Sequence, residues 1–144
     1  MKREEHFEKL GNMYAAAPIT SQWPSTIHIE EGRAEVVIPV HSGFFHGAGA
    51  LHGAIYFKAM DDAAFFAVSS LVEDVFVLTV SFTVYFTRPI SKGEIHAVGR
   101  VVHPSKSIFL AEAEAFDSEG HPVGRANGAF VRSKIPLGPD VGYM

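Results

Sequence analysis

The feature that most constrains the fold is an apolar run over residues 54–72 whose only charged residues are Lys58, Asp61 and Asp62. A membrane span rarely carries three charges at its centre, so we interpret the run as a buried helix that begins at His52 or Gly53. A helix that is apolar nearly all round must be covered on most sides. Burying a carboxylate is costly unless it is paired or hydrogen-bonded, so the two acids need a structural or a chemical reason.

The segments around this helix alternate with period two and predict β-strands. The expected strands cover residues 26–31, 34–41, 75–88, 94–103, 107–117 and 123–133. One antiparallel sheet curled around the apolar helix is the economical way to cover it. We therefore predict a single α+β domain over residues 1–144, with an N-terminal helix in residues 1–17 and a flexible tail in residues 136–144.

The composition excludes several classes of protein. The formal net charge is -4, and the basic residues form no dense block, so neither nucleic acid nor an anionic membrane is an expected partner. The absence of cysteine rules out disulfides, thiolate metal sites and cysteine nucleophiles. The charged N-terminus is not a secretory signal, so we expect a cytoplasmic location.

Polar groups gather where the apolar helix begins. His46 and His52 flank a glycine-rich loop, and Gly53 follows. The first N–H groups of a helix have no partner inside it, and with the helix dipole they can stabilise an oxyanion. A glycine at this position lets a substrate carbonyl approach the backbone closely. These residues are candidates for binding a reacting carbonyl group.

Asp61 follows His52 by nine residues, which is roughly 13 Å along a helix axis. It therefore cannot act on a group held at the start of its own helix. If the two cooperate, one subunit offers the helix start and another offers Asp61, which implies at least a dimer. Asp61 and Asp62 point about 100° apart, so we expect one to face the site and the other to form a structural salt bridge or to cap a strand.

Structural readings of the same residues stay open at this point. A carboxylate in an apolar helix is often only a partnered structural residue, and His52 can simply cap the helix. The histidines and Asp61 lack the tight spacing of metal ligands, so no metal site is expected. No phosphate-binding loop or Gly-x-Ser-x-Gly nucleophile elbow is present.

Three motifs together resemble the hotdog-fold acyl-CoA thioesterases, in particular their PaaI-like, phenylacetate-pathway branch. They are His52-Gly53-Ala54, an acid nine residues after the histidine, and a threonine-rich strand from Thr79 that ends in Arg88-Pro89. The resemblance implies a long helix wrapped by a curved antiparallel sheet, and homodimers, often homotetramers, with active sites at the interface. It also implies hydrolysis of an acyl-coenzyme A thioester, with coenzyme A as part of the substrate and no cofactor.

The resemblance assigns catalytic roles to four residues. Asp61 corresponds to the general base that activates water, or to the nucleophile that attacks the thioester carbonyl. The Gly53 N–H corresponds to the group that polarises that carbonyl, and His52 to a residue that supports the loop. His46 stands where such enzymes often carry an amide that holds water or the carbonyl.

It also suggests residues that contact substrate. Thr79 stands where a strand hydroxyl lines the pocket, and Ala54 replaces the second glycine of the motif. Phe65 stands where some relatives carry a hydroxyl, which suggests a more apolar acyl pocket. Phe45 and the neighbouring phenylalanines are expected to line that pocket and favour an apolar or aromatic acyl group.

Three other functions remain as alternatives. The first is a non-catalytic protein that binds acyl-CoA on the same fold. The second is an acyl-CoA hydratase or dehydratase, although such enzymes usually place an Asp and a His only a few residues apart. The third is a small metalloenzyme.

Overall fold

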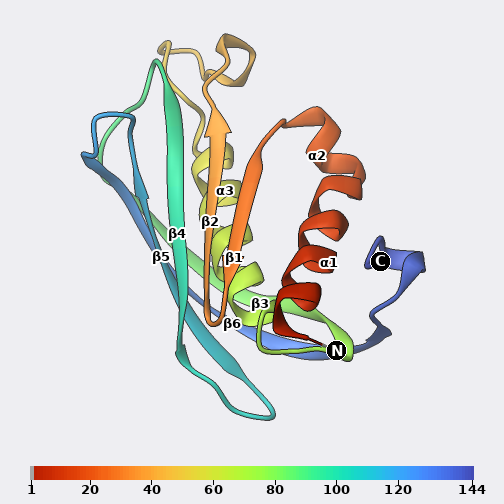
Figure 1. Ribbon diagram of the computed structural model, residues 1–144. Helices are drawn as coiled ribbons and strands as arrows, with labels where there is room; N and C mark the ends of the chain where they lie inside the picture. The colour runs from red at the N-terminus through yellow and green to blue at the C-terminus, as the bar shows by residue number, and fades with distance from the viewer. Residues whose placement is uncertain (1) are drawn as a thin grey trace.

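A computed structural model describes residues 2–144 of the chain (Figure 1). Its elements in chain order are α1 (Arg3–Ala16), α2 (Pro18–Gln22), β1 (Thr26–Glu30), β2 (Arg33–Pro39), η1 (Ser42–Phe44), α3 (Gly53–Ser69), β3 (Val75–Phe86), β4 (Glu94–His103), β5 (Phe109–Phe116), β6 (Pro122–Pro136) and η2 (Pro139–Val141). The predicted strands are all present with shifted ends. The short helix α2 was not predicted.

The strands form one sheet in the order β1-β2-β4-β5-β6-β3, in which every neighbouring pair is antiparallel. The sheet curves around α3, and it stays open with β1 and β3 at its edges (Figure 1). This is the architecture of a long helix wrapped by a curved antiparallel sheet that the sequence predicted.

Small residues bring α3 close to the sheet. Ala59, Ala63 and Ala67, spaced one helical turn apart, have no exposed surface. A Cβ on Gly99 of β4 would lie 2.3 Å from the backbone of Ala63, so only glycine permits this approach. Asp61 lies between two of these alanines in sequence and therefore points away from Gly99 and the middle of the sheet, toward the edge strand β3.

The N-terminal helix α1 and the C-terminal segment form a second layer beside β1 and the end of α3 (Figure 1). Leu10, Met13 and Tyr14 of α1 are buried together with Phe66 and Tyr143. The structure thus differs from the flexible tail expected for residues 136–144. The contact joins the two ends of the chain, so no local sequence pattern predicts it.

The two edges of the sheet differ in character. β1 has five residues, whereas β3 has twelve and carries a bulge between Thr79 and Ser81. Exposed apolar side chains lie along β3 at Leu78, Val80, Tyr85 and Phe86. A long apolar edge is a ready template for another strand.

Within residues 2–144, no helix has both the length and the apolar character needed to cross a membrane.

Candidate active site

The start of α3 is fixed by His52. Its ring Nδ1 accepts a hydrogen bond of 2.9 Å from the Ala54 N–H, and the backbone N–H of His52 donates to the Phe44 carbonyl at 2.9 Å. Because Nδ1 is the acceptor, the neutral ring carries its proton on Nε2. His52 is therefore the N-cap of the helix, a role that suits a side chain able to accept from the second helical N–H.

This cap leaves one amide available. Among residues 2–144, the Gly53 N–H has no hydrogen-bond acceptor, whereas the amides of Ala54 and Ile55 both donate to His52. A Cβ on Gly53 would lie 3.0 Å from the Phe86 ring, so glycine also makes room for this ring at the helix start. The free N–H, reinforced by the helix dipole, is a donor for an oxygen that develops negative charge.

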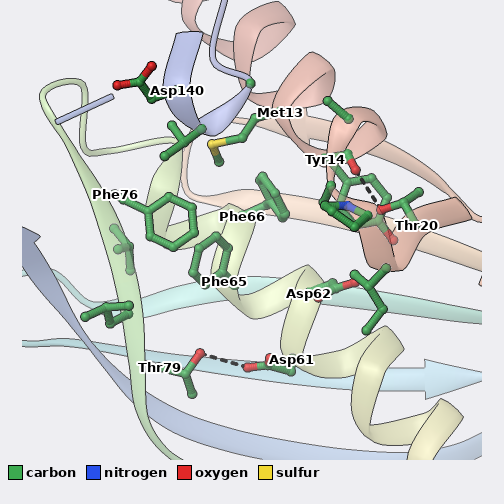
Figure 2. A pocket seen from close by; sticks show the side chains of 18 of the residues that line it. Met13, Tyr14, Thr20, Asp61, Asp62, Phe65, Phe66, Phe76, Thr79 and Asp140 are labelled. Atoms are coloured by element: carbon green, nitrogen blue, oxygen red, sulfur yellow. Dashed lines mark hydrogen bonds between the residues drawn. The ribbon is translucent and has the colours of Figure 1, made fainter. Parts of the chain in front are cut away.

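Asp61 lies two turns further along α3 and faces β3. The Thr79 hydroxyl donates to Asp61 Oδ1 at 3.1 Å (Figure 2). Burial, together with the charge of Asp62, raises the pKa of Asp61 to about 6, although Thr79 and Lys58 oppose this rise. A carboxylate with a pKa near neutrality is a stronger base than an exposed one and is still ionised at pH 7.

Asp62 faces the other way, toward α1 and α2 (Figure 2). It forms an ion pair with Lys58, one turn earlier on α3, and both side chains are largely buried. The Lys58 Nζ also lies 5.3 Å from the centre of the Tyr14 ring. Burial raises the pKa of Asp62, and Lys58 and Tyr14 oppose the rise. Asp62 is thus the member of the pair that forms the structural salt bridge.

Two cavities meet at these aspartates. The first, which we call the helix-start cavity, has a volume of about 730 Å³ and reaches from His52, Gly53 and Ala54 to Asp61. The second, which we call the aromatic pocket, has a volume of about 690 Å³ and extends from Asp61 and Thr79 past Phe65 and Phe76 to the C-terminal segment (Figure 2). Asp61 therefore lies where an apolar compartment adjoins the groove that leads to the free amide.

The structure brings most of the predicted residues to these spaces. Gly53, His52 and Ala54 line the helix-start cavity, and Thr79 and Phe65 line the aromatic pocket. His46 lies beside a smaller hollow that it shares with Gly53, and its Nδ1 accepts from the Ala48 N–H at 3.0 Å. Phe45 is half-buried, bridges to Leu51 and lines neither cavity that contains Asp61.

Several wall residues escaped the sequence analysis. The aromatic pocket is also lined by Met13 and Tyr14 of α1, Phe76 of β3, residues 139–142 and Met144. Their positions depend on how the two ends of the chain pack on α3, which no local pattern encodes. Lys58 was visible as a charge in the apolar run, and its spacing of four residues from Asp62 was the available signal for the ion pair.

No group of three or more His, Asp or Glu side chains within residues 2–144 is arranged to hold a metal ion. His52 and His46 each use Nδ1 to accept from a backbone N–H. At this site, the Asp61 carboxylate can act as a base and the Gly53 N–H as a hydrogen-bond donor.

Comparison with known proteins identifies the family. The sequence model described as "Thioesterase superfamily" matches residues 48–123, which include the helix start, Asp61 and Thr79. A protein of Saccharolobus solfataricus is 27% identical over 134 residues, which cover 92% of each chain. One of Sulfurisphaera tokodaii is 32% identical over 101 residues, which cover 69% of this chain and 74% of the relative. Both relatives carry the description "Putative esterase".

Solved structures have the same fold. The PaaI protein of E. coli, from the phenylacetic acid degradation operon, superposes with a TM-score of 0.85 at 21% identity and covers 93% of this chain and 97% of its own. A thioesterase family protein from Silicibacter pomeroyi superposes with a TM-score of 0.81 at 26% identity and covers 86% and 95%. These likenesses confirm the hotdog fold predicted from the sequence. The chain belongs to the thioesterase superfamily, and this membership supports the conclusion that it is a hydrolase that acts on thioesters.

Proposed function

We propose that the protein hydrolyses acyl-coenzyme A thioesters to the free acid and coenzyme A, in a homodimer whose active sites are shared between protomers. The observation that carries the proposal is the Asp61 carboxylate, with its pKa raised to about 6 at the junction of two cavities, together with an unpaired Gly53 amide that a second protomer can present to it. Membership of the thioesterase superfamily supports the class of reaction.

The proposed chemistry uses these two groups directly. The Gly53 N–H donates to the thioester carbonyl oxygen and stabilises the negative charge that develops there. Asp61 accepts a proton from water as the water oxygen bonds to the carbonyl carbon. The carbon–sulfur bond then breaks, and the thiolate of coenzyme A takes up a proton. If Asp61 instead attacks the carbonyl itself, water hydrolyses the resulting anhydride, and the products are the same.

The two groups must come from different protomers. Asp61 follows Gly53 by eight residues, which is about 12 Å along one helix. A base and an oxyanion donor that act on one carbonyl must lie within hydrogen-bond reach of it. If a second copy supplies the Gly53 N–H, the donor and Asp61 no longer have to lie on the same helix, and both can reach one carbonyl.

The exposed edge of β3 is the surface proposed for this pairing. Val80 and Tyr85 are 61% and 60% exposed, and Thr79, the partner of Asp61, lies on the same strand. Antiparallel pairing of two β3 strands would bury these side chains and bring the partner's helix start close to Asp61. Two such dimers would form the homotetramer that the sequence resemblance implies.

Mixing two inactive variants tests both the reaction and the shared site. Gly53→Pro removes the N–H donor, and the extended backbone of His52 (φ -65°, ψ 142°) tolerates a following proline. Gly53→Ala is the matched control, because it adds a similar contact with Phe86 but keeps the donor. The base is removed by Asp61→Asn. Release of free thiol from a panel of acyl-CoA substrates is the measurement.

We expect Gly53→Pro and Asp61→Asn to be nearly inactive alone and to recover about a quarter of wild-type activity after the subunits are mixed, because half of the dimers then contain one intact site. Gly53→Ala should retain far more activity than Gly53→Pro. If mixed dimers form but activity stays absent, the shared site is wrong. If no acyl-CoA is hydrolysed by the wild type while such compounds raise its melting temperature, the non-catalytic binding protein is the better description.

A further inference from the structure

The aromatic pocket is built largely by segments that the family match does not include. Its far wall consists of residues 13–14 and 16–20 at the N-terminal end and residues 139–142 and 144 at the C-terminal end, whereas the thioesterase model matches residues 48–123. Only the near wall, which carries Asp61 and Phe65 of α3 and Phe76 of β3, lies within the matched region. The two ends of this chain therefore give the pocket its depth.

Two buried hydrogen bonds and one exposed hydrogen bond hold the far wall in place. His6 has no exposed surface; its Nε2 donates to the Ser69 carbonyl at 2.9 Å, and its Nδ1 accepts from the Tyr143 hydroxyl at 2.7 Å. The Asn12 side-chain amide donates to the Met144 carbonyl at 2.8 Å. Because α1, the end of α3 and the C-terminal segment are joined in this way, the pocket is formed before any ligand binds.

The interior of the pocket is apolar and aromatic. The ring of Phe65 lies 5.1 Å from that of Phe66 and 5.4 Å from that of Phe76, both edge to face or tilted (Figure 2). An apolar cavity of about 150 Å³ is enough to bind benzene. The volume of about 690 Å³ is therefore far more than an acetyl group needs, and it suits a bulky apolar group.

The charges around the pocket are unfavourable for an anion. Asp61, Asp62 and Asp140 all line it, and Lys58 is the one basic residue among the lining side chains within residues 2–144. Lys58 is already paired with Asp62. Asp140 lies at the end of the pocket away from Asp61 (Figure 2). A second carboxylate on the acyl group would be repelled there in a region of reduced solvent screening.

We infer that the aromatic pocket binds the acyl group of the substrate, that this group is bulky, apolar and uncharged, and that the C-terminal segment sets its maximum size. The inference rests on the proposed acyl-CoA hydrolysis, because the thioester carbonyl would lie at Asp61 with the acyl group in the pocket and coenzyme A on the side of the helix-start cavity. Beyond the proposed reaction, the inference names the class of acyl group that is accepted and the part of the chain that selects it.

One pair of variants tests the role of the C-terminal segment. Val141 and Leu137 are both half-buried apolar residues of this segment, but only Val141 lines the pocket. Val141→Phe should narrow the pocket, and Leu137→Phe is the matched control for a bulky substitution nearby. The substrates are acetyl-, hexanoyl-, benzoyl- and succinyl-CoA, and the readouts are kcat/KM and the Kd from calorimetry with the Asp61→Asn variant.

In the wild type we expect kcat/KM for hexanoyl- and benzoyl-CoA to exceed that for acetyl- and succinyl-CoA at least tenfold. Val141→Phe should lower the values for the two bulky substrates about fivefold to tenfold and leave acetyl-CoA within about twofold. Leu137→Phe should leave all of them within about twofold. A preference for acetyl- or succinyl-CoA, or an equal loss for every substrate in Val141→Phe, overturns the inference.

The binding measurement separates this inference from the proposed function. If no substrate is hydrolysed, the hydrolysis proposal fails, and the affinities decide about the pocket. The pocket assignment stands if the benzoyl group improves the Kd at least tenfold over coenzyme A alone and Val141→Phe removes this gain. It fails if the acyl group adds nothing to binding.

Discussion

The two sides of α3 at Asp61 and Asp62 form an instructive contrast. On the side of β3, the Asp61 carboxylate has one hydrogen bond, from Thr79, and opens onto two cavities. On the side of α1, Asp62 is paired with Lys58 beneath the Tyr14 ring. Burial raises the pKa of both carboxyls. The difference lies in the partners: Asp62 has a buried cation, and Asp61 has only a neutral hydroxyl.

This difference teaches how a single helical segment can carry both a reactive and a structural acid. A cation beside a buried carboxylate favours its charged form and opposes the effect of burial, and the ion pair occupies the carboxylate oxygen that would otherwise accept a proton from water. A buried carboxylate with a single neutral donor keeps a free lone pair that can accept a proton from water. Perturbed pKa values alone do not separate the two cases, but the partners do.

The largest expected effect separates the two acids by rate. Asp61→Asn should lower kcat for acyl-CoA hydrolysis by roughly 10² or more, because the amide cannot accept the proton of water. The protein should stay folded, since the amide keeps the shape and can still bond to Thr79. Steady-state kinetics and thermal unfolding measure the two quantities. Near-normal turnover in this variant would remove the proposed base.

The next largest effect separates the acids by stability. Asp62→Asn should change kcat by less than about fivefold and lower the free energy of unfolding by about 2 kcal/mol, because it leaves the Lys58 ammonium buried without its counter-charge. The Lys58 side chain is 10% exposed, so water cannot replace the lost partner. Denaturant unfolding monitored by circular dichroism measures the loss.

The double variant Lys58→Met with Asp62→Asn is the control for this prediction. It removes both charges, so most of the lost stability should return. A fall in kcat as large as that of Asp61→Asn, in either Asp62 variant, would mean that the roles of the two acids are misassigned.

Whether the sequence alone predicts a feature of Asp61 and Asp62 depends on how far apart in the chain the contacting residues lie. The apolar run predicted α3 and its start at His52 or Gly53, and the distance between Asp61 and the helix start can be read directly from the sequence. The different directions of the two acids on one helix predicted a salt bridge or a strand cap for the second acid, and the structure shows the salt bridge. These features are local, so a single sequence carries them.

The rest depends on contacts between distant segments. The Tyr14 ring over Lys58 and the burial of Tyr143 against α1 come from the packing of the two chain ends, which periodicity does not encode. Thr79 was placed by resemblance, since the bulge beside it breaks the simple alternation of β3. Phe45 was expected in the acyl pocket because of its type, but the loop that carries it folds back on Leu51.

The pH dependence sharpens the comparison further. Because the pKa of Asp61 is about 6, kcat/KM should be constant above pH 7 and fall about tenfold per pH unit below pH 5. A folded-state pKa above the unfolded value of 3.8 means that Asp61 adds stability at low pH and loses this contribution as the pH rises through 6.

Asp61→Asn should therefore be more stable than the wild type at pH 8 by about 1–2 kcal/mol, and the difference should shrink toward pH 4. Unfolding curves at pH 4, 6 and 8 measure it. A difference that stays constant across this range would show that Asp61 does not titrate as described.

The smallest expected effect concerns Thr79. Its hydroxyl stabilises the charged form of Asp61, so Thr79→Val should raise the pKa of Asp61 and move the acidic limb of the kcat/KM profile to higher pH by about half a unit. Thr83→Val, on the same strand and also exposed, is the matched control and should leave the limb in place. The shift must appear in the pH profile rather than in the plateau rate alone, because a merely structural change at β3 would lower the plateau and leave the titration unmoved. An unshifted limb in Thr79→Val would mean that the limb reports a group other than Asp61, and the contrast between the two acids would then need a different origin.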